Sequence, residues 1–152
     1  MTTVSAMVAR ERCRFDEARA TLLAVLAVLA RGQALGAQRL QLGVLDNLAI
    51  AAANRGRWRE SVEWAERMRT LADSIGALPR VARADQHLAL AAEALGDHET
   101  AMHRHRQVLA ITRANGDRVH GVASLQRLGV LHRKQGDAST ASQWHASRRL
   151  CI

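Results

Sequence analysis

Histidine is the residue type in this 152-residue chain that most readily suggests chemistry, because its ring can bind a metal ion or accept a proton. The chain contains seven histidines. His103 and His105 are separated by one residue, so a helix would point their side chains in nearly opposite directions and they could not chelate one ion. His105 and His145 lie 40 positions apart. We therefore expect these two and His132 to pack in a core or an interface, and we expect no metal site.

The sequence contains no motif of an enzyme active site. It has no glycine-rich phosphate loop, no nucleophile elbow and no zinc-binding His-Glu-x-x-His sequence. Cys13 and Cys151 are too few for a disulfide framework and do not have the spacing of metal ligands. We therefore expect no catalytic residue and no cofactor, and the cysteine content is typical of a reducing, cytoplasmic compartment.

The composition is that of a helical protein. The chain has 29 Ala and 19 Leu but one Pro, one Phe and no Tyr. This excludes a β-sandwich or a barrel, and a hydrophobic content of 48% excludes a disordered chain. The length suits one domain. The apolar run from Leu22 to Ala30 has about half the length that a membrane span needs, so we expect no membrane segment.

The glycines form two regular series, each with a period of 40 residues. The positions are Gly56, Gly96 and Gly136 in one series and Gly36, Gly76 and Gly116 in the other. A glycine can end a helix in the left-handed conformation, so each period is predicted to contain two helices. The expected helices span 3–12, 14–31, 38–55, 58–75, 78–95, 98–115, 118–135 and 138–151.

Other positions repeat with the same period. Leucine recurs at Leu48, Leu88 and Leu128, each followed by a small residue that lets neighbouring helices approach closely. An acidic N-cap follows three of the glycines, at Asp97, Asp117 and Asp137. Pro79 falls in an expected first helical turn, where its missing N–H group costs little.

These residues resemble the tetratricopeptide-repeat family. The resemblance rests on the run Gly-Asp-His-Glu-Thr-Ala at 96–101, on Val108 and Leu109, and on the repeated leucine-small pair. The period is similar to the long, 40-residue variety found in bacterial signalling ATPases and transcription regulators. The resemblance implies an all-α, right-handed superhelical solenoid of antiparallel helix pairs in a single domain, 1–152. Its parts would be a partial repeat at 1–36, with Cys13 where glycine is usual, full repeats at 37–76 and 77–116, and a last repeat at 117–152.

The resemblance also implies that the first helix of each repeat lines a concave, partner-binding face. The positions on this face are Asp46, Asn47, Asn54, Arg83, Gln86, His87, Glu93, Gln126, Arg127, Arg133 and Lys134. His87 and Arg127 align with Asn47, the asparagine that holds peptide backbone in adaptor members of the family. The face changes from mixed to basic charge along the chain. It is therefore either a solvated polar surface or a groove for a polypeptide segment with acidic residues at one end.

The function that the sequence favours is a non-catalytic protein–protein interaction scaffold or regulatory module. A net charge of +8 suggests nucleic-acid binding as an alternative, but acidic residues are interleaved with the basic ones and four aromatic residues give no stacking platform. A further alternative is the sensor part of a larger bacterial transcription regulator or signalling ATPase. Of the 22 basic residues, 21 are Arg, which suggests a GC-rich bacterial genome.

The expected helix 14–31 is apolar over an unusually broad arc. Its apolar positions cover roughly 220°, about twice the stripe of an ordinary surface helix. The short segment 3–12 could cover only part of this surface. We therefore expect a homodimer held by this helix, through Leu22, Leu23, Val25 and Val28.

Overall fold

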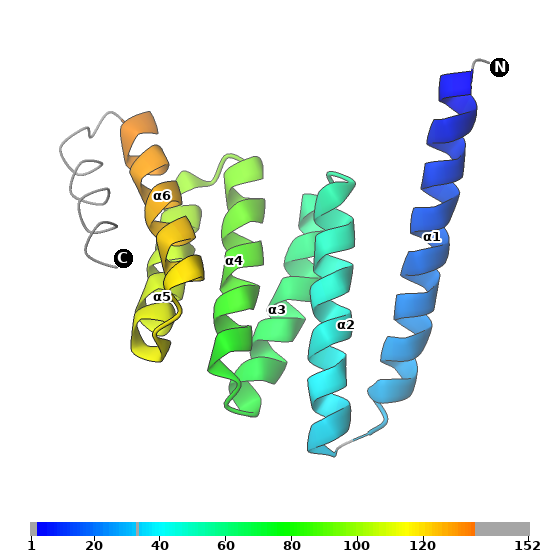
Figure 1. The fold of residues 1–152 in the computed structure, drawn as a ribbon, viewed down its shortest axis with the longest axis horizontal. Helices are drawn as coiled ribbons and strands as arrows, with labels where there is room; N and C mark the ends of the chain where they lie inside the picture. Colours follow the sequence, from blue (N-terminus) through cyan, green and yellow to red (C-terminus); the bar gives the residue numbers. More distant parts are fainter. Residues whose placement is uncertain (1–2, 33, 136–152) are drawn as a thin grey trace.

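The computed structural model describes residues 3–32 and 34–135, and in these residues it consists of six α-helices without a β-strand (Figure 1). The helices are α1 (Thr3–Leu29), α2 (Leu35–Asn54), α3 (Trp58–Ser74), α4 (Leu78–Ala94), α5 (His98–Asn115) and α6 (Arg118–Lys134). Consecutive helices pack side by side in chain order, and α4 also contacts α2. The predicted all-α repeat solenoid is confirmed. The expected helix 138–151 lies outside the described residues.

Four of the series glycines end helices as predicted. Gly56, Gly76, Gly96 and Gly116 have φ angles of 72°, 68°, 80° and 69°. After each of them, the next N–H group donates to a carbonyl five residues back, as from Asp97 to Ala92 at 2.8 Å. This hydrogen bond can close the end of the helix only when the residue just before the donor has a positive φ. That conformation favours glycine. The shared glycine geometry explains why α3, α4 and α5 end where the period places them.

The prediction for Gly36 is wrong. Gly36 is the second residue of α2, which begins at Leu35, three positions earlier than expected. The N–H group of Gln38 already donates to the Ala34 carbonyl at 3.1 Å, so the helical pattern includes the glycine. The turn between α1 and α2 falls earlier, around Gly32, whose N–H group bonds to the Leu29 carbonyl at 2.9 Å. Gly136 lies outside the described residues.

The predicted N-caps are confirmed at two positions. Asp97 accepts a hydrogen bond from the Thr100 N–H group at 3.1 Å, and Asp117 accepts one from the His120 N–H group at 3.2 Å. Hydrogen bonds from the side chains of Thr100 and His120, together with these backbone hydrogen bonds, lower the pKa of both carboxyl groups. Pro79 lies in the first turn of α4, as expected. Asp137 lies outside the described residues.

The first helix differs most from the prediction. A break near Cys13 was expected between helices 3–12 and 14–31, but α1 continues through it for 27 residues. Cys13 stands where the other repeats have glycine, so nothing there favours the left-handed turn that ends a helix. At 1.5 Å per residue α1 is about 40 Å long, against about 30 Å for α2. Its N-terminal turns therefore extend past the end of α2 instead of folding back (Figure 1).

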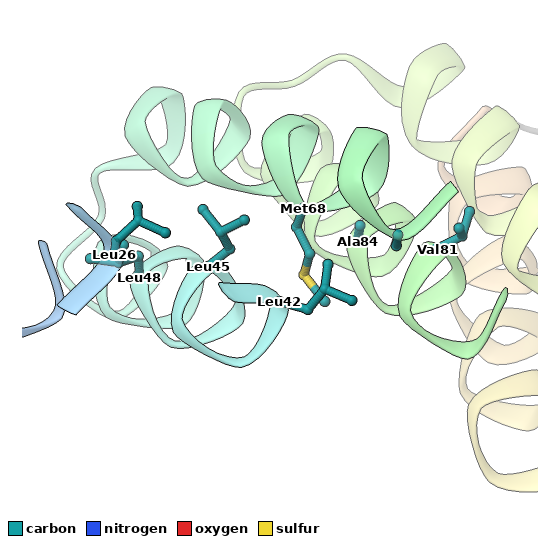
Figure 2. Packing of buried hydrophobic residues seen from close by; sticks show 8 residues of the cluster. Leu26, Leu42, Leu45, Leu48, Met68, Val81 and Ala84 are labelled. Atoms are coloured by element: carbon teal, nitrogen blue, oxygen red, sulfur yellow. The ribbon is translucent and has the colours of Figure 1, made fainter. Parts of the chain in front are cut away.

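The core is a row of leucine and small residues between the helices. In Figure 2 it runs from Leu26 of α1 past Leu45 of α2 to Met68 of α3 and Val81 of α4. A second cluster joins α4, α5 and α6 through Ala92, Ala101, Met102, Leu109, Leu125, Leu128 and Leu131. The recurring leucines are all buried, at Leu48, Leu88 and Leu128. The repeated sequence columns are therefore the positions where neighbouring helices pack.

Candidate functional site

A groove crosses the first helices of the repeats, α2, α4 and α6. Its central hollow has a volume of about 530 Å³. A second hollow of about 460 Å³ adjoins it toward the start of α4 and α6, and Arg83, Gln86 and His120 line both. We call the two hollows together the first-helix groove. Of the predicted partner-binding residues, it brings together Asp46, Asn54, Arg83, Gln86, His87, Gln126 and Arg127.

The remaining predicted positions lie beside the groove or below it. Asn47 is exposed on α2, and Arg133 and Lys134 are exposed at the end of α6; these three do not line either hollow. Glu93 is nearly buried, with its carboxylate beneath the side chain of Arg127. The basic end of the face is thus separate from the central hollow.

Asp46 joins α2 to α4 across the groove. Its Oδ1 atom lies 2.5 Å from Nε2 of His87 and 3.2 Å from Nε of Arg83, and its Oδ2 atom lies 3.8 Å from a guanidinium nitrogen of Arg80. Burial alone would raise the pKa of Asp46, but the hydrogen bond from His87 and the charge of Arg83 outweigh it and lower the pKa. Asp46 is therefore a carboxylate already occupied by two hydrogen-bonding side chains of α4, with Arg80 as a more distant ion-pair partner.

Glu93 has the same role between α4 and α6. Arg127 donates to it with two nitrogens: Nε lies 3.1 Å from Oε1, and Nη2 bonds to Oε2. The Nε2 atom of His105 also lies 2.8 Å from Oε1. Burial lowers the pKa of His105 to about 4, so its ring is neutral near pH 7 and its Nε2–H group donates a hydrogen bond to the carboxylate.

In the column of Asn47, His87 and Arg127, two of the three side chains make contacts within the chain. The side chains of His87 and Arg127 each bind a carboxylate on the preceding first helix, and so connect neighbouring repeats. Sequence reasoning placed all of these residues on one face but missed that they pair with each other. A signal was present: Asp46 and Glu93 lie on the helix before each basic residue, on the same predicted face.

A third carboxylate, which sequence reasoning also missed, lies away from the groove. Asp85 of α4 is 0% exposed, and its Oδ1 atom lies 2.9 Å from Nε of Arg69 on α3 and 3.0 Å from a guanidinium nitrogen of Arg104 on α5. Its position four residues after Val81 places it within the buried stripe of α4. This bridge joins three consecutive helices and has a structural role.

The histidines are placed as expected where the structure describes them. His105 and His132 are buried in the helix packing, while His145 lies outside the described residues. In the described part of the chain, no group of three His, Cys, Asp or Glu side chains is arranged to hold a metal ion. None of the described helices is long and apolar enough to cross a membrane.

The predicted self-association residues divide between two sides of α1. Leu22 and Leu23 pack beside Leu26 against the core cluster that includes residues of α2, so they are partly buried within the chain. Val25 is half-exposed and Val28 is 71% exposed. Toward the N-terminal end, Met7 is also largely exposed. The broad apolar arc is therefore half covered within the chain.

Comparison with known proteins agrees with this architecture. Residues 42–72, which make up most of the α2–α3 pair, match a family model described as "Tetratricopeptide repeat". The chain is similar to the crystal structure of the TPR domain of Arabidopsis FLU, with a TM-score of 0.69 and 14% identity over 74% of this chain and 95% of that chain. No curated protein matches the sequence.

A second solved structure, that of BtubC from P. vanneervenii, gives a TM-score of 0.78 and 18% identity, and covers 97% of this chain and 60% of that one. The chain therefore matches a tetratricopeptide-repeat model over one helix pair and has the fold of tetratricopeptide-repeat domains, in agreement with the resemblance to this family read from the sequence. Such repeats generally mediate contacts between proteins and are generally not catalytic.

Proposed function

We propose that this protein is a cytoplasmic scaffold or regulatory module that binds a segment of another polypeptide in the first-helix groove. The observation that carries the proposal is the groove itself, which runs across three repeats and is lined by residues of the predicted partner-binding face. A groove of this size on rigid, packed helices suits an extended or helical segment.

The segment is proposed to have acidic residues at one end. Arg133 and Lys134 are exposed at the end of α6, and Lys134 follows Arg127 by two helical turns, on the same side of the helix. Charges at the end of a groove set the orientation and the rate of binding more than the affinity. The acidic end of the partner would therefore lie against the end of α6.

Nucleic acid is a less favoured ligand because many arginines have carboxylate partners within the chain. The pairs include Arg69 and Arg104 with Asp85, and Arg127 with Glu93. Phosphate contacts need cations that are available to release counterions, and here these guanidinium groups are already engaged.

The groove is tested by capture from a lysate of the native host with three immobilised proteins: wild type, Gln126→Trp and Arg106→Trp. Gln126 is exposed in the groove, whereas Arg106 is exposed on α5, outside both hollows. Proteins that use the groove are retained by wild type and Arg106→Trp but lost by Gln126→Trp. Equal capture of the same proteins by all three would contradict the proposal.

We also propose that the chain forms a homodimer through the outer side of α1. The exposed side chains of Val25 and Val28, with Met7 toward the start of the helix, offer an apolar surface on α1. Val28→Glu should raise the dimer dissociation constant at least about tenfold, as measured by sedimentation equilibrium at micromolar concentrations. Because Val28 is exposed, its replacement spares the core, unlike that of Leu23. A wild-type chain that stays monomeric there would contradict this proposal.

A further inference from the structure

We infer that the centre of the first-helix groove recognises a large, uncharged apolar side chain of the partner segment, such as leucine, isoleucine, methionine or phenylalanine. This inference rests on the proposed function and adds to it the chemistry of the residue that is bound. Acidic residues of the partner would then contact only the end of α6, and an apolar residue would fill the central hollow.

The lining of the central hollow includes apolar residues from three helices, which we call its floor. Ile50 and Ala53 of α2, Leu90 of α4 and Ala123 of α6 line it. Leu90 is 44% exposed although it lies in the middle of the groove. Covering such a surface with a partner side chain removes apolar area from water on both molecules, which is favourable in proportion to the area.

The charged groups around this floor are already paired within the chain. Asp46 is bound by His87 and Arg83, and Glu93 is bound by Arg127. At the start of α6, the Nδ1 atom of His120 lies 2.7 Å from Oδ2 of Asp117. A charged side chain entering the hollow would lose its water and find no free counter-charge, which is costly. The hollow therefore favours a neutral residue.

Three amide side chains surround the floor and are available for hydrogen bonds. Asn54, Gln86 and Gln126 line the same hollow, one from each first helix, and within the described residues their amide groups have no hydrogen-bond partner. An amide donates and accepts at once, which matches the N–H and C=O groups of a peptide backbone. We assign them to the backbone on either side of the bound apolar residue.

The experiment uses the full chain as bait for a phage-displayed library of random 12-residue peptides. The selected peptides should share one large apolar residue, and Leu90→Ser should weaken their binding at least about tenfold, since the buried leucine surface is lost. Ala123→Trp fills the hollow without removing apolar surface, and it should weaken the binding of these peptides by a similar factor. Leu40→Ser is the matched control, because Leu40 is 62% exposed near the start of α2, away from both hollows.

The outcomes separate this inference from the proposed function. Peptides without a shared apolar residue, or peptides that bind Leu90→Ser and Ala123→Trp as well as wild type, overturn the inference. If such peptides still lose binding to Gln126→Trp, the groove function stands and its apolar centre does not. A selection that yields no peptide contradicts both. Far-ultraviolet circular dichroism of each variant verifies that the helices are retained.

Discussion

The inner helices and the N-terminal helix are held by different means. Helices α3, α4 and α5 each pack between two neighbours, end at a left-handed glycine or just before one, and share the buried carboxylate of Asp85. Helix α1 packs mainly on α2, and its ion pairs are only partly buried: the side chain of Asp16, which binds Arg55, is 62% exposed, and that of Arg19, which binds Glu60 of α3, is 38% exposed. Each inner helix is therefore closed by a periodic glycine and packs between two neighbours, whereas among the described residues α1 is followed by no glycine with a positive φ and packs mainly on α2.

The largest effect is expected from the buried bridge of the inner helices. The double variant Arg69→Ala and Arg104→Ala leaves Asp85 buried without its two partners, which should lower the free energy of unfolding by about 3–5 kcal/mol. The matched change at the N-terminal end, Asp16→Ala, removes an exposed pair and should cost at most about 1 kcal/mol. Urea denaturation followed by circular dichroism measures both. Equal losses would show that the two regions are held alike.

The inner helices should also make the free energy of unfolding depend on pH. Burial lowers the pKa of His105 to about 4, whereas an unfolded chain has a histidine pKa near 6.5. The unfolded state therefore binds a proton first as the pH falls below about 6.5, and the folded state loses roughly 2 kcal/mol between pH 7 and pH 5. Urea denaturation at both pH values measures this loss.

His105→Gln should remove most of that pH dependence, while His103→Gln, at an exposed position of the same helix, should leave it unchanged. A wild-type stability that stays constant from pH 7 to pH 5 would mean that His105 is protonated as easily in the folded chain as in the unfolded one.

The glycines give the finest comparison of the two regions. Gly96→Val places a β-branched residue at φ 80° and should cost about 1–2 kcal/mol. An added Cβ atom would meet nothing within 4 Å there, so the cost is backbone strain alone. Gly36→Ala, inside α2 and also in open space, should instead stabilise the chain by about 0.5–1 kcal/mol. Thermal unfolding measures both, and the same sign for both would contradict the assigned helix ends.

The sequence predicted the fold best where its period is intact. The expected helices 58–75, 78–95, 98–115 and 118–135 agree with α3 to α6 within one residue, because a glycine or an acidic cap marks their ends. Near Cys13 the glycine is missing, and the expected break is missing as well. Gly36 keeps the period but not the geometry, because a helix can include a glycine near its first turn where no left-handed bend is imposed.

The groove was predictable as a surface but not as a set of interactions. The period places Asp46, His87, Glu93 and Arg127 on one predicted face, and in the structure Asp46 contacts His87 while Glu93 contacts Arg127. Which of them pair depends on the distance between neighbouring first helices, and no pattern along one helix contains that distance. Asp85 was missed for a related reason, since an acidic residue is ordinarily assigned to solvent until its arginine partners on other helices are known.

The packing of each described helix on its chain neighbours also affects how the molecule assembles. The main contacts join consecutive helices, apart from that of α2 with α4, so the sequence separation between touching residues is small. A chain of this kind closes mainly short loops while folding, which favours folding within microseconds to milliseconds. It can nucleate at any adjacent helix pair and propagate in both directions. The α4–α5 pair, joined by Asp85 and Arg104, is well suited to start, with α1 docking last.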